Sequence, residues 1–125
     1  MRFDLETRYP DYDTKGHVNN AVYLTYFEVA RNRVWVAMGG GADFGFVVAE
    51  ATVRYMSQAR IGDPLDIEIR TSDVRNKAWV WTYRITNTHS NALVAEGSTV
   101  QVMYDYEARQ SIPVPDALRG QLSDL

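Results

Sequence analysis

The sequence predicts an α+β domain in which one long buried helix is wrapped by a five-stranded antiparallel sheet. Residues 21–38 contain no Pro or Gly and stop at Gly39-Gly40-Gly41, which is typical of a helix with a clear C-terminal end. The apolar residues of this segment cover most of a helical circumference, so the helix needs a sheet around it. One strand-like segment precedes the helix and four follow it. Residues 1–125 are expected to form a single domain, because neither a repeat nor a linker divides them.

The first strand and the loop after it occupy residues 1–20. Residues 1–9 alternate loosely between apolar and polar side chains, as a half-buried strand does, and Pro10 closes the segment. The following residues are dense in Asp, Gly and Asn, which fix turns or bond to the nearby backbone, so they predict an ordered loop. Asn19 or Asn20 is expected to cap the helix that follows.

The second half of the sequence predicts a meander of four long strands. The third of these strands places Trp79, Trp81 and Tyr83 on one face, which favours packing against the helix or a subunit interface over an acyl-binding site. A short C-terminal helix is expected after Pro115-Asp116. The four expected strands are residues 46–56, 65–74, 78–86 and 92–106.

The composition excludes several kinds of function. The chain has no Cys, hence no disulfide or thiolate nucleophile, and with His17 and His89 as the remaining soft ligands no metal site is expected. Thirteen Lys and Arg against sixteen Asp and Glu give a net charge of −3, without the basic excess of a nucleic-acid-binding protein. No apolar run reaches the roughly 18 residues of a membrane span, and residues 1–10 lack the apolar core of a signal peptide. A cytoplasmic protein that binds neither nucleic acid nor membrane is expected.

The run of residues 11–31 indicates a family. Asp13 stands three residues before Gly16, the sequence His-Val-Asn-Asn then ends at Asn20, and an aromatic-rich helix follows. With the element order and the Ala-Arg-Ile-Gly-Asp-Pro-Leu of residues 59–65, this run resembles the hotdog-fold acyl-CoA thioesterases of the 4-hydroxybenzoyl-CoA thioesterase family, over nearly the whole chain. The resemblance implies a hydrolase that releases a carboxylic acid from an acyl-CoA thioester. It also implies that no cofactor is needed, because coenzyme A is part of the substrate, and a homodimer or homotetramer with pockets between subunits.

The start of the helix supplies the expected catalytic groups. The first backbone N–H groups of a helix lack intrahelical partners and the helix dipole is positive there, so a thioester carbonyl at this end gains hydrogen bonds as it becomes an oxyanion. The Asn20 amide, or a neighbour within one residue, is the candidate donor. Asp13, on which the family motif falls, is the candidate general base or nucleophile, and Asp11 is the competing carboxylate. Either Asp could instead cap a turn of the loop.

Four further residues near the helix start are candidates for substrate binding: His17, Val18, Asn19 and Tyr23. A structural role competes with binding at several of them. His17 could pack within the loop, Asn19 could cap the helix, and Tyr23 could belong to the core.

Glu28 is a carboxylate on the helix itself, and a second branch of hotdog thioesterases uses a helical Glu. It is not expected to act here, because at a rise of about 1.5 Å per residue it lies too far from the helix start to share a carbonyl with it. Glu28 is predicted to pair with Arg31 or Asn32 at helical spacing.

A basic turn between the second and third strands of the meander carries Arg75 and Lys77. The family resemblance implies that these two residues bind the phosphates of coenzyme A, and Arg offers two parallel hydrogen bonds to a phosphate. The alternative is that both cations are simply solvated and keep an exposed hairpin soluble.

Two other classes of function remain open at the level of the sequence. A hotdog dehydratase or hydratase would use Asp13 with His17, which lie four residues apart in one loop. A non-catalytic acyl-CoA-binding protein would use the same pocket without turnover. The sequence does not fix the acyl group, nor does it distinguish coenzyme A from acyl carrier protein as the donor.

Overall fold

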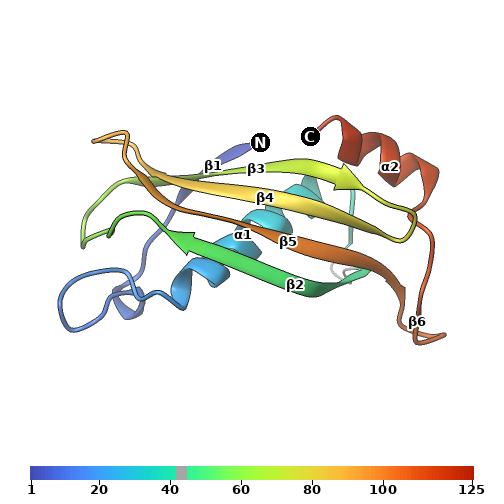
Figure 1. Ribbon diagram of the computed structural model, residues 1–125, viewed down its shortest axis with the longest axis horizontal. Helices are drawn as coiled ribbons and strands as arrows, with labels where there is room; N and C mark the ends of the chain where they lie inside the picture. The colour runs from blue at the N-terminus through green and yellow to red at the C-terminus, as the bar shows by residue number, and fades with distance from the viewer. Residues whose placement is uncertain (42–44) are drawn as a thin grey trace.

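The computed structural model describes residues 1–41 and 45–125. In this part of the chain an antiparallel sheet of six strands packs against one long helix, and a shorter helix follows at the C-terminus (Figure 1). The predicted α+β class is therefore confirmed. The strands are β1 (Arg2–Leu5), β2 (Phe46–Tyr55), β3 (Leu65–Val74), β4 (Ala78–Asn87), β5 (Leu93–Asp105) and β6 (Gln110–Ser111); the helices are α1 (Val22–Ala37), α2 (Asp116–Ser123) and a 3₁₀ turn at Tyr9–Asp11.

The strand order differs from the predicted meander in one respect. The strands lie in the order β1-β3-β4-β5-β2, and the two-residue β6 pairs with the end of β5. The strands β3, β4 and β5 form a meander as predicted, but β2 pairs with β5 rather than with β3, so β2 and β1 occupy opposite edges. The prediction of five strands missed β6, because two residues are too short to show a periodicity.

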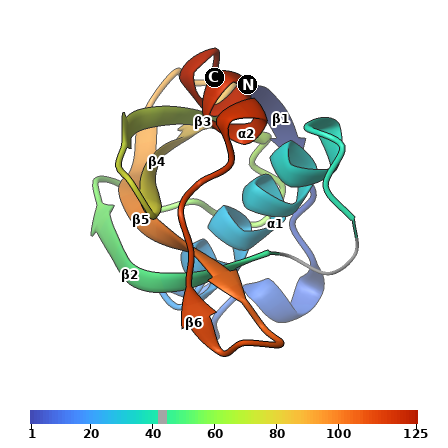
Figure 2. The same ribbon diagram turned by 90° about the vertical axis from the view of Figure 1, so that its right-hand side faces the viewer.

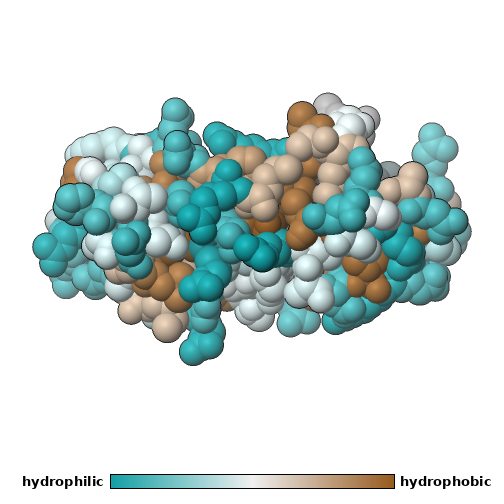
Figure 3. All heavy atoms as spheres, turned by 90° about the horizontal axis from the view of Figure 1, so that it is seen from above, coloured by the Kyte–Doolittle hydropathy of each residue, from teal (hydrophilic) through white to brown (hydrophobic). Residues whose placement is uncertain are grey.

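The helix α1 is buried along one face. Its buried side chains recur at the spacing of a helical stripe and include Tyr23, Phe27 and Ala30. The expectation that most of its circumference is buried is wrong for the single chain, since Val29 is 37% and Val36 64% exposed. Figure 2 shows the reason, since the sheet lies on one side of α1 and leaves its other side uncovered. Figure 3 shows that hydrophobic side chains reach the surface of the molecule. No helix within residues 1–41 and 45–125 combines the length and the apolar character needed to span a bilayer.

The core between α1 and the sheet is built around the aromatic stripe of β4. Trp79 and Trp81 are fully buried, and the ring of Tyr83 stacks on Phe27 of α1 with the ring centroids 4.3 Å apart. The predicted packing of this stripe against the helix is thus confirmed. Gly97 of β5 lies under the same contact, and a Cβ there would overlap the Phe27 ring, so this position requires glycine.

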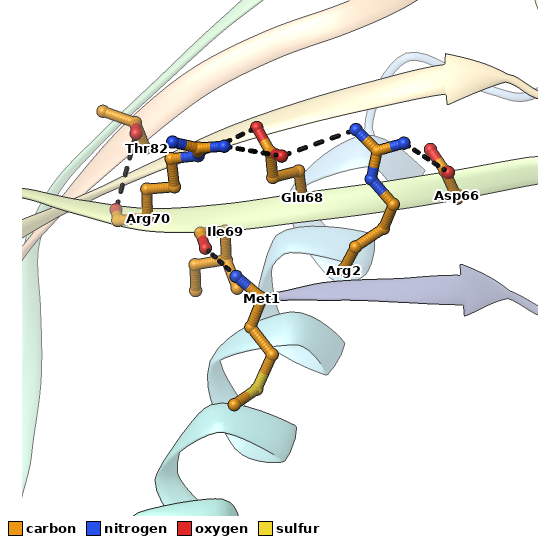
Figure 4. A network of polar contacts seen from close by, with 7 residues as sticks. All are labelled: Met1, Arg2, Asp66, Glu68, Ile69, Arg70 and Thr82. Atoms are coloured by element: carbon orange, nitrogen blue, oxygen red, sulfur yellow. Dashed lines mark hydrogen bonds and ion pairs between the residues drawn. The ribbon is translucent and has the colours of Figure 1, made fainter. Parts of the chain in front are cut away.

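The edge strand β1 is fixed to β3 by charged side chains (Figure 4). Arg2 lies 3.4 Å from both the Asp66 and the Glu68 carboxylates, and Arg70 pairs with Glu68 at 3.2 Å. The N-terminal amine also donates to the Ile69 carbonyl at 2.9 Å. These contacts fix the N-terminal end of β1 to β3.

Candidate active site

The loop between β1 and α1 is held by its own backbone and by the segment that precedes β3. After the 3₁₀ turn, Tyr12 and Val18 pair across a tight reversal of the chain. Gly16 lies in the reversal with φ of 77°, a conformation that glycine adopts without strain. The Val18 amide donates to the Ala59 carbonyl at 2.8 Å, and Val18 is buried. The loop is therefore fastened to the segment before β3 on the C-terminal side of its tip.

The carboxylate of Asp13 is oriented by two backbone amides. Its Oδ1 accepts the N–H of Lys15 at 2.8 Å and that of His17 at 3.1 Å, whereas Oδ2 makes no hydrogen bond within the described part of the chain. The two amides, that of His17 first, lower the pKa of Asp13 below its usual value of 3.8. The side chain is exposed, so the carboxylate is ionised at neutral pH and open to water. One oxygen thus caps the turn while the other is available to a ligand.

The start of α1 leaves the Asn20 amide without a hydrogen-bond partner among residues 1–41 and 45–125. The two amides that follow it are occupied: Asn19 Oδ1 accepts that of Ala21 at 3.0 Å, and the Asn19 carbonyl accepts that of Val22 at 2.9 Å. Asn19 therefore caps the turn that leads into the helix. The prediction that Asn19 or Asn20 is the N-cap of the helix itself is wrong, since Ala21 occupies that position and no side chain caps it. The hydroxyl of Tyr55, at the end of β2, donates to the Asn20 carbonyl at 3.0 Å and fixes this turn to the sheet.

These groups line one pocket of about 300 Å³, at the lower end of the range for small-molecule sites. Five of the lining residues come from the loop and α1, and the sequence predicted all five as site residues. The other four come from the end of β2 and the residues after it, and the sequence analysis missed them. The lining residues are Asp13, His17, Val18, Asn20 and Tyr23, together with Tyr55, Met56, Ser57 and Gln58. The two polar residues Ser57 and Gln58, directly after the predicted strand 46–56, are the one signal in the sequence that could have indicated them.

Tyr23 and Tyr55 form an aromatic wall of the pocket, with ring centroids 5.6 Å apart. Tyr23 is 2% exposed, and this burial raises the pKa of its hydroxyl, which stays neutral across the physiological range. The sequence left open whether Tyr23 belongs to the core or to the pocket wall, and in the structure its side chain belongs to both.

Asp11, the competing carboxylate, has a different environment from Asp13. It is 1% exposed and is not a lining residue of the pocket. Both of its carboxylate oxygens are engaged, by the backbone and guanidinium of Arg8 and by the hydroxyl of Tyr26. Of the two candidates, Asp13 is therefore the one with an oxygen that water or a substrate can reach.

The remaining predicted binding residues lie elsewhere. Asn19 is not a lining residue, because its side chain is used in capping. Arg75 and Lys77 lie in the turn between β3 and β4, at the end of the sheet that carries α2 and far from the loop before α1 (Figure 1). At about 3.3 Å per residue, the ten residues of β3 separate the two regions by roughly 30 Å.

Glu28 is exposed on α1 and does not line the pocket. The predicted pairing of Glu28 with Arg31 or Asn32 is wrong, since Glu28 forms no ion pair or hydrogen bond with any described residue. Arg31 lies instead beside the hydroxyl of Tyr83.

A metal site was not expected, and no cluster of three or more His, Asp or Glu side chains that could hold a metal ion occurs in the described ranges. The groups that the pocket offers for chemistry include a carboxylate, a backbone amide, an imidazole, a side-chain amide and hydroxyls.

Comparison with known proteins identifies the family. The model of the thioesterase-like superfamily matches residues 7–122. The chain is 31% identical over 111 residues to the acyl-CoA thioester hydrolase YbgC of Escherichia coli O157:H7, covering 84% of this chain and 82% of that protein. It is 25% identical to the long-chain acyl-CoA thioesterase FadM of Escherichia coli strain K12, covering 100% of this chain and 98% of that protein.

A solved structure agrees with these relatives. A thioesterase from Thermus thermophilus, crystallised with coenzyme A and Zn, superposes with a TM-score of 0.87 and is 29% identical, covering 98% of this chain and 91% of that one. The resemblance predicted from residues 11–31 is confirmed. The chain belongs to the thioesterase-like superfamily and has the hotdog fold of its thioester hydrolases.

Proposed function

We propose that this protein hydrolyses an acyl-CoA thioester to a free carboxylic acid and coenzyme A. One observation carries the proposal: among the residues that the structure describes, one oxygen of Asp13 and the amide of Asn20 have no hydrogen-bond partner, and both residues line the same pocket. A carboxylate can take a proton from water, and an amide can bind the oxygen that becomes negative. The substrate class is supported by the names of the two Escherichia coli relatives, both of which are acyl-CoA thioesterases.

In the proposed reaction, Asp13 takes a proton from a water molecule as the water oxygen attacks the thioester carbon. The electron pair of the C=O bond moves onto the carbonyl oxygen, which the Asn20 amide and the positive end of α1 stabilise. One such donor contributes about 3 kcal/mol to a transition state. When the carbonyl re-forms, the C–S bond breaks and coenzyme A leaves as a thiolate, which takes up the proton.

Direct attack by Asp13 on the thioester carbon is the alternative first step, and it would give a mixed anhydride that water then opens. The low pKa of Asp13 keeps the carboxylate ionised for either role. A single turnover in ¹⁸O-labelled water, followed by mass spectrometry, detects an anhydride that water opens at its aspartyl carbon. Attack by water leaves Asp13 unlabelled, whereas opening of the anhydride at its aspartyl carbon introduces the label into Asp13.

His17, Val18 and Tyr23 are proposed to contact the thioester and the first part of the acyl group, because they line the pocket beside Asp13 and Asn20. Asn19 is proposed to act through the helix start rather than by touching the substrate, since it holds the amides of Ala21 and Val22.

We infer that the protein acts at least as a homodimer. The strand β2 lies at an edge of the sheet, is ten residues long, and exposes Val48 and Tyr55 by more than two fifths. A long uncovered edge favours pairing with another strand. Sedimentation at micromolar concentration tests this inference, and an active monomer would contradict it.

The same pairing supports phosphate binding by Arg75 and Lys77. Strand register puts the start of β4 level with the Phe46 end of β2. Antiparallel pairing of two β2 strands about a twofold axis would bring that end of one protomer beside the Tyr55 end, and hence the pocket, of its partner. Coenzyme A is therefore proposed to extend from the pocket of one subunit toward the basic turn of the other.

Release of thiol by the purified protein tests the proposed function. The chain has no Cys, so a thiol reagent reports only the coenzyme A that is released. An acyl-CoA panel should contain aliphatic chains of several lengths and aromatic acids, with the matching acyl carrier protein thioesters as a parallel series. Release above the uncatalysed rate for at least one acyl-CoA is expected. Binding without release, or hydration of an enoyl-CoA exceeding its hydrolysis, would contradict the proposal.

A further inference from the structure

Asp11 is a buried carboxylate that the proposed reaction does not use. Its side chain is 2% exposed, whereas the Arg8 side chain with which it pairs is 68% exposed. Removing a carboxylate from water is costly unless hydrogen bonds replace the lost hydration. Asp11 forms three: Oδ2 accepts the Arg8 amide at 2.8 Å and the Tyr26 hydroxyl at 2.9 Å, and Oδ1 accepts the Arg8 guanidinium at 3.1 Å.

These contacts join three pieces of chain that meet at the pocket. Tyr26 lies one turn beyond Tyr23 on α1, is 3% exposed, and packs edge to face on Tyr23 with ring centroids 6.0 Å apart. The main chain of Asp11 continues the connection, since its carbonyl accepts the Asn19 amide at 2.8 Å. Asn19 in turn holds the amides of Ala21 and Val22. A closed ring of hydrogen bonds thus runs from α1 through Asp11 and Asn19 back to the start of α1.

We propose that Asp11, held by Tyr26, is a positioning residue that sets the geometry between Asp13 and the Asn20 amide. Asp13 is two residues after Asp11, and Asn20 follows the residue that the Asp11 carbonyl binds, so both reacting groups are attached to this ring. A shift of about 1 Å between reacting groups can cost a hundredfold in rate. The inference rests on the proposed function, because it assigns a role in that same site.

The Tyr26 hydroxyl can be removed without removing its ring, so Tyr26→Phe tests the inference. It is expected to lower kcat about tenfold and to change KM for an acyl-CoA by less than about twofold, because the pocket walls stay while the reacting groups lose their alignment. Tyr83→Phe is the matched control. The Tyr83 hydroxyl is also buried under α1 and bonds to Thr99 at 2.6 Å, but it takes no part in the ring. Tyr83→Phe is expected to lower the melting temperature about as much as Tyr26→Phe does and to leave kcat unchanged.

Asp11→Leu, which keeps the branched shape of the side chain and removes both acceptor oxygens, should lower kcat in the same way. The double variant Asp11→Leu/Tyr26→Phe should be no slower than the slower single variant, because both changes break the same contact between Asp11 and Tyr26. Equal kcat for Tyr26→Phe and wild type would overturn the inference, as would an equal fall of kcat in Tyr83→Phe.

Hydrogen exchange gives a readout that does not depend on activity. Peptides covering residues 11–20 should exchange faster in Tyr26→Phe than in wild type, and at the wild-type rate in Tyr83→Phe. Unchanged exchange in Tyr26→Phe overturns the positioning role even if the protein hydrolyses acyl-CoA. Absence of thiol release by the wild type contradicts the proposed function instead, so the two failures are distinguishable.

Discussion

The two ends of the sheet use their charged and polar side chains in opposite ways. At the start of α1, Asp13 has one unbonded carboxylate oxygen, and the nearby Asn20 amide has no partner among the residues that the structure describes. At the turn between β3 and β4, Arg75 pairs with Asp73 at 2.9 Å, and Arg119 of α2 donates to the Arg75 carbonyl at 3.0 Å. One end thus leaves polar groups available around a cavity, while the other uses them to hold its own backbone.

This difference separates groups that are able to react from groups that can at most bind. Polar groups that bond to no other part of the protein beside a pocket are available to a ligand, and a few such groups are typical of binding sites. Exposed ion pairs such as Arg75 with Asp73 contribute between about 0 and 1 kcal/mol, so this arginine can exchange its partner for a phosphate at little cost. Changes at the first end should therefore affect kcat, and changes at the second should affect KM.

Asp13→Asn should have the largest effect. Loss of a general base or nucleophile is expected to lower kcat by about a thousandfold, measured by thiol release. The substituted amide keeps an oxygen for the Lys15 and His17 amides, so the turn should persist. Asp105→Asn is a matched control, because Asp105 Oδ1 accepts two backbone amides in the same way at the turn after β5. Wild-type rates in Asp13→Asn, or an equal loss in Asp105→Asn, would contradict the account.

The double variant Arg75→Ala/Lys77→Ala should come next. Loss of two phosphate contacts at an exposed site, each contributing about 0.7 kcal/mol, is expected to raise KM for acyl-CoA about tenfold and leave kcat within about twofold. The same acyl group on pantetheine, which lacks the nucleotide, should show no such rise. Arg70→Ala removes an arginine with a comparable surface ion pair and should leave KM unchanged. An equal rise of KM for the pantetheine substrate would show that these residues do not recognise the nucleotide.

Tyr55→Phe should have a smaller effect, on kcat. Its hydroxyl fixes the Asn20 carbonyl at 3.0 Å, and loss of a neutral hydrogen bond of about 1 kcal/mol corresponds to about fivefold in rate. Tyr106→Phe removes a hydroxyl that donates to the Phe46 carbonyl at the same distance, at the other end of β2. If the two variants lost the same activity, the orientation of Asn20 would not be the cause.

The pH dependence should be the weakest effect in the physiological range. Two backbone amides hold the folded-state pKa of Asp13 below 3.8, so the carboxylate remains ionised as the pH falls through the range above that value. The acid limb of kcat/KM is therefore expected below pH 3.8, with less than about a twofold loss between pH 7 and pH 5. An acid limb near pH 6 would assign the base to a group other than Asp13.

The sequence predicts the local part of this site and not the distant part. Asp13, His17, Val18 and Asn20 lie within eight residues, so turn chemistry and the start of a helix bring them together. Tyr55 is 35 residues from Asn20, and nothing in the pattern of either segment reveals that they meet. The burial of the Asp11 carboxylate likewise depends on a partner 15 residues away, the hydroxyl of Tyr26.

The fold shows the same limit. The range 65–74 matches β3 at both ends, and α1 is one residue shorter at each end than predicted. Alternation of side chains reports which face of a strand is buried, but not which strand lies beside it. The pairing of β2 with β5 therefore could not be derived from periodicity, and it is this pairing that places the end of β2 at the pocket.

A crystal structure with a ketone analogue of acyl-CoA, in which CH₂ replaces the sulfur, tests most directly whether the reaction takes place at the start of α1. The carbonyl oxygen of the analogue is expected about 3 Å from the Asn20 amide, with Asp13 Oδ2 facing the carbonyl carbon directly or through one water molecule. A carbonyl bound away from the Asn20 amide, or one that Asp13 does not approach, would contradict the account.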